Sequence, residues 1–415
     1  MGQDLKARLR RYRDTGKAHA EQETARNQAR NPSRARNSGG VNTEVSWPGW
    51  VEAGFKTLKR VVSRELSLPL PLAFIKSLPI LVPDFFRLGR LPSPGELLFF
   101  DLETTGLSGG AGTVTFLAAF GRFDIAAIPG GTNSCGQSRA RLTITQYLLL
   151  DYPGESDFIE RVVSHLHPAS LEPNQTVEQP LVVSFNGKSF DSQIIKTRCL
   201  MTGIKSPDYF HADLLHPARR LWKKTLPDCS QSTIEVSALG LDRDGDVSGV
   251  MAPDIWFAFL KNGENRELLS VCEHNVKDIS GLATLFLSLA QIAAEPLESR
   301  SKFRCNEEAL AFFWWKMLKR RSGLFWSDEL YRNYSKTGEM LLEKAAGNGN
   351  PQAAVILAKN AEWHLRDFKQ ALRYTDMALA NSDIPDSFRE ELNRRRCRLE
   401  GKLSFSALPD IPQNK

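Results

Sequence analysis

The stretch from residue 96 to residue 292 alternates between strand-like and helix-like hydrophobic patterns, and this alternation constrains the fold more than any other feature. Three runs rich in β-branched and aromatic residues come first and predict strands at 96–103, 113–123 and 141–150. A helix, a strand, a helix, a strand and a long helix are then predicted at 155–166, 181–185, 189–200, 210–215 and 263–292. This order predicts an α/β fold with helices flanking a mixed sheet, at 93–295.

A basic segment precedes this region. Residues 1–40 hold ten Lys or Arg and four Asp or Glu, which accounts for the whole net charge of +6. The polar composition predicts a disordered tail at 1–45. Two alternatives stay open for it: an arm that contacts phosphates without reading sequence, or a solvated leader with no role.

Two further regions flank the predicted α/β domain. Residues 46–92 are apolar and Pro-rich, and the four prolines between 69 and 83 exclude a long helix. We interpret this segment as an extension lying on the main domain, with a lid or partner-binding segment as the alternative. Residues 296–415 predict an all-α region that offers a surface for a protein partner. The segment 350–385 suggests a helix pair, either tetratricopeptide-like or a plain hairpin.

Composition bounds the cellular setting. With 41% hydrophobic and 25% charged residues and no run of eighteen apolar residues, the chain predicts no transmembrane helix and no membrane partner. Its start lacks the apolar core of a secretory signal. The six cysteines are widely spaced without a C-x-x-C motif, which favours reduced thiols and a cytoplasmic location over a disulfide framework or zinc ribbon.

The first predicted strand ends in two acids within FFDLETTGL (99–107). Alternation along a strand places Asp101 and Glu103 on the same face. Two like charges at a buried strand end repel each other, and a bound cation removes that cost. The alternative is a strand that ends in a solvated acidic turn. The Gly-rich loop that follows favours the first interpretation, because it leaves room for a nucleotide.

Two later segments add two more acids and a histidine. In SFNGKSFD (184–191), Asp191 is predicted to begin a helix, where simple helix capping is the alternative role. In CEHNVKD (272–278), His274 and Asp278 are four residues apart on a helix and share one face. A histidine there can act as a general base near neutrality, whereas an ordinary surface pair is the alternative.

Four carboxylates from three segments suit a pair of divalent cations. Hard oxygen ligands favour Mg²⁺ or Mn²⁺, and two such ions can clamp the attacking and leaving oxygens of a phosphodiester. The predicted metal ligands are Asp101, Glu103, Asp191 and Asp278, with His274 completing the catalytic set.

The order and spacing of these motifs resemble the proofreading-type exonucleases of the ribonuclease H-like superfamily, which carry four acids in three motifs. N-x-x-x-F-D, from Asn186 to Asp191, is similar to their second motif. One departure is that His274 stands four residues before the last Asp, a spacing those enzymes use for tyrosine. The chain also resembles a bacterial family of such domains with tetratricopeptide-like tails, over roughly residues 95–290. The resemblance implies a ribonuclease H-like fold and a metal-dependent exonuclease, with 3'-to-5' polarity expected.

Several residues near these motifs are candidates to contact nucleic acid with a single-stranded end. They are Thr104, Gly106, Leu107, Asn186, Phe190, Arg219 and Arg220. The last two lie in HADLLHPARRLWKK (211–224), where Trp222 offers a stacking face. The alternative there is a solvated helix face with one anchoring Trp, and Asp213 is expected to support the sheet. We interpret DRDGDVSG (242–249) as a turn, since it lacks the closing Glu of a calcium loop.

Two other classes of function remain open. One is a scaffold or nucleic-acid-binding protein on an inactive nuclease fold, and the other is a structure-selective endonuclease with the same acids. The choice between DNA and RNA also stays open, because a contact to the 2'-hydroxyl leaves no mark in a sequence.

Overall fold

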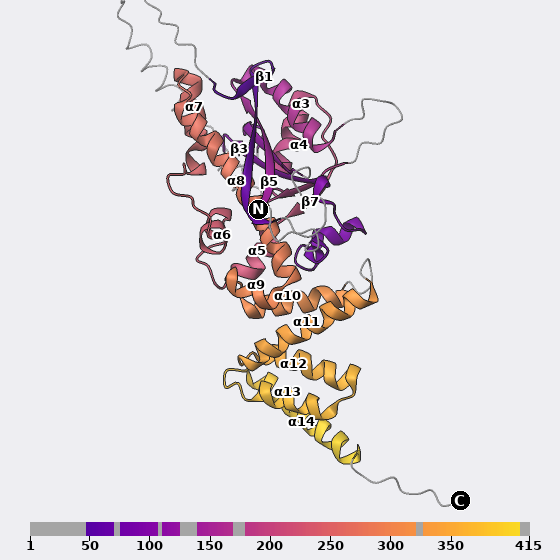
Figure 1. Cartoon of the computed structure of the whole chain (residues 1–415). Helices are drawn as coiled ribbons and strands as arrows, with labels where there is room; N and C mark the ends of the chain where they lie inside the picture. Colours follow the sequence, from indigo (N-terminus) through magenta and orange to yellow (C-terminus); the bar gives the residue numbers. More distant parts are fainter. Residues whose placement is uncertain are drawn as a thin grey trace, which may run out of the picture. The chain divides into compact units, whose positions relative to one another are not determined.

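A computed structural model describes residues 47–69, 75–106, 110–124, 139–168, 179–320 and 327–406, and these contain one seven-stranded mixed sheet (Figure 1). The predicted basic tail at 1–45 and Leu107 lie outside the described residues. The strand order is β1-β2-β5-β4-β3-β6-β7. The strands from β1 to β3 in this order pair antiparallel, whereas β6 pairs in parallel with both β3 and β7.

The five predicted strands and three predicted helices of the α/β region are all present. The strands are β3 (Leu97–Thr104), β4 (Thr115–Phe123), β5 (Arg139–Leu149), β6 (Leu181–Ser184) and β7 (Phe210–Asp213). The corresponding helices are α3 (Glu155–Leu166), α4 (Asp191–Thr202) and α8 (Arg266–Ala294). Three shorter helices, α5 (Leu215–Trp222), α6 (Gln231–Ser237) and α7 (Ala252–Asn262), complete the region. The predicted α/β fold class is confirmed.

The segment 46–92 is more than an extension lying on the domain, because its first half forms part of the sheet. β1 (Trp50–Gly54) and β2 (Thr57–Pro69) make a hairpin, and β2 pairs antiparallel along β5 from Thr57 opposite Leu149 onward. Charged residues on the exposed side of β2 hide its strand pattern in the sequence. The prolines that follow allow only the short 3-10 turns η1 (Leu78–Ile80), η2 (Pro83–Leu88) and η3 (Pro94–Glu96).

The sheet is buried on both faces at its centre. In β3, Phe99 packs into one core cluster, with Phe286 of α8, while Leu98 and Phe100 pack into the other, beneath α3. This explains why the run before Asp101 is continuously apolar: a strand covered on both sides has no solvent-facing position. β3 is therefore a rigid support for the acids at its end.

Helix α8 is the longest element of the core. By length and composition alone it could cross a membrane, but 78% of its most apolar window is buried within the protein. It packs against β3, β4 and β2. The helix therefore holds its polar residues at a defined position over the sheet.

The region after residue 295 is all-α in its described residues, as predicted. Its helices are α9 (Pro296–Lys302), α10 (Glu307–Arg320), α11 (Asp328–Gly347), α12 (Pro351–Asn360), α13 (Phe368–Leu379) and α14 (Asp386–Ser406). A short π-helix, η7 (Ala361–Leu365), joins α12 to α13. From α10 to α14 each helix packs against the next. The helix pair expected at 350–385 is confirmed as α12 and α13, and its tetratricopeptide-like character stays a prediction.

Candidate active site

The predicted acids and histidine all line one cavity of about 490 Å³. Asp101 and Glu103 come from β3, Asp191 from the first turn of α4, and His274 and Asp278 from α8. Four of the predicted nucleic-acid contacts line the same cavity: Thr104, Gly106, Asn186 and Phe190. The structure thus brings together residues that are up to 177 positions apart in the sequence, from Asp101 to Asp278.

Strand direction explains the meeting point. β3 and β6 run in parallel, with Phe99 opposite Val183, so their carboxyl ends lie at the same edge of the sheet. Asp101 and Glu103 stand at the end of β3, and a short turn leads from β6 to Asp191. Clefts at the carboxyl ends of strands are the usual position for ligands in open α/β sheets.

The turn that carries Asp191 is tightly specified. Asn186 has a φ of 66°, an unusual value for a non-glycine residue. The Asp213 carboxylate accepts the backbone N–H of Asn186 at 2.9 Å and of Lys188 at 3.2 Å, which holds this conformation. A Cβ on Gly187 would lie 2.4 Å from Ser184 Oγ and 2.8 Å from Asp191 Oδ2, so the turn requires glycine there. Asp213, the last residue of β7, therefore supports this turn, whereas the sequence predicted that it supports the sheet.

The acids of the cavity are held in an environment that opposes their charge. Burial, with the nearby Asp278 charge, raises the pKa of Asp101 to about 7. Burial and then the Asp101 charge raise the pKa of Glu103 well above its ordinary value, and the same two causes act on Asp191. Ionised together, these carboxylates repel one another, so the site favours bound positive charge.

His274 lies between two carboxylates. Its Nε2 is 3.2 Å from Asp278 Oδ2, and its Nδ1 is 3.0 Å from Asp246 Oδ2. Burial acts against a charge on the ring, but Asp278, Asp246 and Glu103 outweigh it and raise the pKa of His274 to about 9. Ligand atoms of Glu103, His274 and Asp278 lie within 4.8 Å of one another, close enough to share a metal ion.

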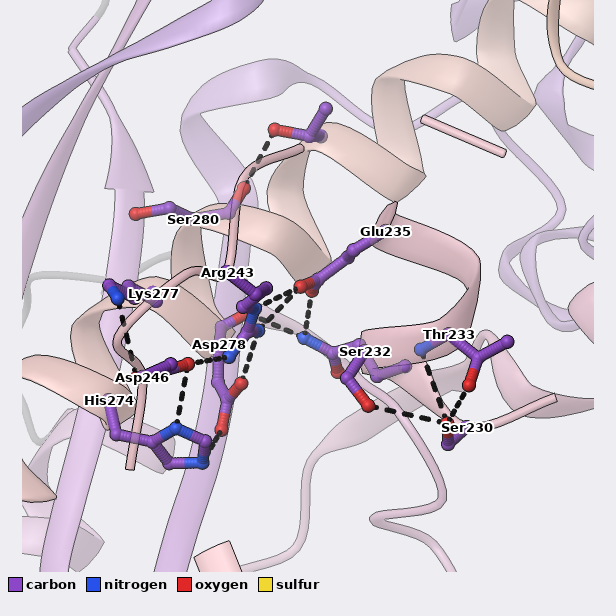
Figure 2. A network of polar contacts seen from close by, with 12 residues as sticks. Ser230, Ser232, Thr233, Glu235, Arg243, Asp246, His274, Lys277, Asp278 and Ser280 are labelled. Atoms are coloured by element: carbon purple, nitrogen blue, oxygen red, sulfur yellow. Dashed lines mark hydrogen bonds and ion pairs between the residues drawn. The ribbon is translucent and has the colours of Figure 1, made fainter. Parts of the chain in front are cut away.

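The turn at 242–249 contributes residues that the sequence interpretation missed (Figure 2). Arg243 Nη2 lies 2.5 Å from Asp278 Oδ1, and Arg243 Nη1 lies 2.7 Å from Asp246 Oδ2. Its Nε donates to the buried Glu235 at 2.7 Å. The segment is a turn, as predicted, but it also orients the fourth acid and the histidine. The sequence signal that could have indicated this role is the cluster of Asp242, Asp244 and Asp246 around Arg243.

A second missed group is a chain of buried polar side chains behind Asp101. Asn275 Nδ2 donates to Asp101 Oδ2 at 2.8 Å, and Asn275 Oδ1 accepts from Gln146 Nε2 at 2.8 Å. Arg60 of β2 then donates to Gln146 Oε1 at 3.0 and 2.6 Å. Through Asn275 these side chains orient the Asp101 carboxylate, and they connect the site to a strand that the sequence did not predict. No sequence motif marks them.

Three residues of HADLLHPARRLWKK lie apart from the cavity. Arg219 and Arg220 are exposed on α5, and the Arg220 guanidinium lies over the Phe313 ring at 4.6 Å. Neither is among the described residues that line the cavity, so their contact with nucleic acid stays a prediction. Trp222 is fully buried and its Nε1 donates to the Phe303 carbonyl at 2.7 Å, which makes it the anchoring Trp rather than a stacking face.

Comparison with known proteins agrees with the fold. A model of the RNase H superfamily matches residues 98–290. The chain is also 30% identical, over 339 residues, to the uncharacterized protein YprB of Bacillus subtilis strain 168. That alignment covers 74% of this chain and 75% of the relative, so the similarity extends beyond the α/β domain.

Proposed function

This chain belongs to the RNase H superfamily, and from that premise we propose that it is a metal-dependent nuclease that hydrolyses phosphodiester bonds of DNA or RNA. The finer proposal is an exonuclease that removes nucleotides from a 3' end and uses two divalent cations. The geometry of the cavity supports it more than any other feature of the molecule.

The observation that carries the proposal is an excess of carboxyl groups over lysine and arginine in one cavity. Four carboxylates line it, and among its described lining residues there is neither lysine nor arginine. Arg243 reaches Asp278 from the side of the turn, which leaves Asp101, Glu103 and Asp191 to face the cavity. A cluster of this kind is costly to bury unless it binds cations.

The donor set fits hard divalent cations. Carboxylate oxygens are the ligands that Mg²⁺ and Mn²⁺ prefer, and Asp101, Glu103, Asp191 and Asp278 supply them from three rigid elements. When bound, two such cations supply Lewis acidity at the attacking and leaving oxygens of the phosphodiester.

The remaining residues position groups and move protons. His274 can accept a proton from water at Nε2 once its pKa falls, and neutralisation of the adjacent Glu103 and Asp278 by cations lowers it. Arg243 orients the Asp278 carboxylate, and Asp246 orients the imidazole ring of His274. Asn186 and Phe190 line the same cavity, and we expect them to contact the sugar and the base of the terminal nucleotide.

A cleavage assay on end-labelled DNA and RNA, single- and double-stranded, with Mn²⁺, Mg²⁺ or EDTA, tests the proposal. We expect ladder-like shortening from one end that needs the metal, and Asp101→Ala should lower its rate by at least a thousandfold, on the order of the loss of essential groups in other hydrolases. The control is Asp244→Ala, at an exposed acid of the turn 242–249, which should leave the rate unchanged.

Two outcomes would contradict parts of the proposal. Cleavage of a circular single strand identifies an endonuclease, because a circle offers no end. Absence of cleavage on every substrate, together with no effect of Mn²⁺ on thermal unfolding, favours a scaffold on an inactive nuclease fold.

A further inference from the structure

A second cavity, of about 360 Å³, lies in the C-terminal helices, away from the acids of the α/β domain. Aromatic and basic side chains from α10, α12 and the π-helix η7 line it. They are Trp315, Lys319, Lys359, Trp363 and His364, and Ile356 and Asn360 complete the lining. Two indole rings and two lysines in one cavity are a combination that helix packing by itself does not require.

The backbone of η7 presents Trp363 to solvent. Trp363 is 61% exposed, whereas the neighbouring Glu362 has a side chain that is 0% exposed. Glu362 turns inward and pairs with Arg395 at 2.7 Å and with Lys402 at 2.9 Å. These ion pairs anchor η7 to α14, while the next residue, Trp363, is exposed. Single turns of π-helix are frequent at functional sites.

The charge around this cavity is positive. Lys319 and Lys359 are exposed, and none of the described residues that line the cavity is acidic. Lys319 Nζ lies 5.1 Å from the centre of the Trp315 ring and 3.4 Å from His364 Nε2. From α14, Lys402 Nζ lies 5.1 Å and Arg398 Cζ 6.0 Å from the centre of the Trp363 ring. Cations thus border both indoles.

Exposed aromatic faces bordered by cations match the chemistry of a single nucleic-acid strand. Bases stack on indole rings whatever their identity, while lysines neutralise the phosphates. An acidic peptide would use the lysines but would cover none of the exposed indole surface of Trp363. A small apolar ligand would use the indoles but not the positive charge.

We propose that the cavity formed by α10, α12 and η7 binds single-stranded nucleic acid, with a base stacked on Trp363 and the backbone along Lys319 and Lys359. The proposal deepens the proposed function, on which it rests for the substrate class, by giving the nuclease a second contact with the strand that it shortens. Binding at this cavity needs no metal.

Fluorescence anisotropy with labelled oligothymidylate and oligouridylate tests it, using the full chain with Asp101→Asn and EDTA so that no cleavage occurs. Trp363→Ala should weaken binding roughly 5- to 150-fold, as loss of one base–aromatic stack does, and Trp363→Phe should restore most of it. Lys359→Glu should weaken binding and reduce its salt dependence. Lys316→Glu, an exposed lysine of α10 outside the cavity lining, should have a smaller effect on both.

Unchanged affinity in Trp363→Ala, with thermal unfolding also unchanged, would overturn the proposal. Displacement of the oligonucleotide by polyglutamate as readily as by unlabelled DNA would also overturn it, in favour of a protein-binding surface. Metal-dependent cleavage by the wild type separates the two proposals. Binding that depends on Trp363 without any cleavage removes only the nuclease, whereas cleavage with binding insensitive to Trp363 removes only this site.

Discussion

Buried carboxylates occur in two regions of this molecule with opposite charge balance. In the α/β domain, Asp101, Glu103 and Asp191 face a cavity whose described lining holds no lysine or arginine, and their pKa values are raised. In the C-terminal helices, Glu362 is more deeply buried, but three cationic side chains surround it, and its pKa is lowered despite burial.

The difference teaches how to separate a structural carboxylate from a functional one. Arg395, Arg398 and Lys402 complete the site of Glu362 within the fold, so nothing further is needed there. Asp101, Glu103 and Asp191 face a cavity whose described lining offers no lysine or arginine, and in the proposed function cations from outside fill that role. The two regions therefore differ in the charge balance around their carboxylates.

The largest expected effect on stability is at Glu362, whose charge is balanced by cationic side chains of the fold. Glu362→Gln leaves Arg395, whose side chain is 7% exposed, without its counter-charge, and should lower the free energy of unfolding by about 3–5 kcal/mol. Urea denaturation measures this. Asp376→Asn breaks the exposed pair with Arg396 and should cost less than about 1 kcal/mol. Equal effects of the two changes would remove the distinction between the regions.

At Asp101, Glu103 and Asp191, which face a cavity whose described lining holds no lysine or arginine, we expect the stability of the protein to depend on pH and on metal. The pKa of Asp101 is raised from 3.8 to about 7, so its contribution to stability is complete below about pH 4 and is lost as pH rises through about 7. The metal-free protein should therefore lose stability over this interval, and Asp101→Asn should lose less. Thermal unfolding in EDTA across this pH range measures the difference.

Metal should reverse that loss above pH 7. Saturation with Mn²⁺ at about a hundred times its dissociation constant stabilises the folded state by about 2.7 kcal/mol for a single site. Asp101→Asn should reduce this gain, while Glu362→Gln should keep it. A metal effect of equal size in wild type and Asp101→Asn would count against the assigned ligands.

The smallest expected effect concerns a residue that orients a ligand without facing the cavity. Asn275→Ala removes the hydrogen bond to Asp101 Oδ2 and should lower metal affinity or cleavage rate about 10- to 100-fold, as for other residues that orient metal ligands. Mn²⁺ titration followed by thermal shift separates the loss of affinity from a loss of rate. Asn333→Ala, on the exposed side of α11, serves as the control.

Much of the site could be predicted because its signals are local. The i and i+2 positions of Asp101 and Glu103, and the i and i+4 positions of His274 and Asp278, follow from the periods of a strand and a helix. The end of an apolar run marked the edge of the sheet. The order of the three motifs then indicated that their residues meet.

Other parts could not be predicted because they depend on contacts between distant segments. Arg60 and Gln146 become a support for Asp101 only because β2 pairs with β5, and Arg243 reaches Asp278 only through the path of a turn. Arg219 and Arg220 carry the right charge, yet their helix places them outside the cavity lining.

The sequence by itself determined the strand and helix order, the α/β class and the five residues that meet in the cavity. The element order follows from hydrophobic periods within single segments, whereas the meeting of the five residues follows from the order of the three motifs and the family resemblance that this order implies. Only the tertiary structure decided the hairpin that widens the sheet, the partners of the acids and the outward position of Trp363. The physical reason is that hydrogen bonds and charge balance between distant segments depend on packing, which local periodicity does not encode.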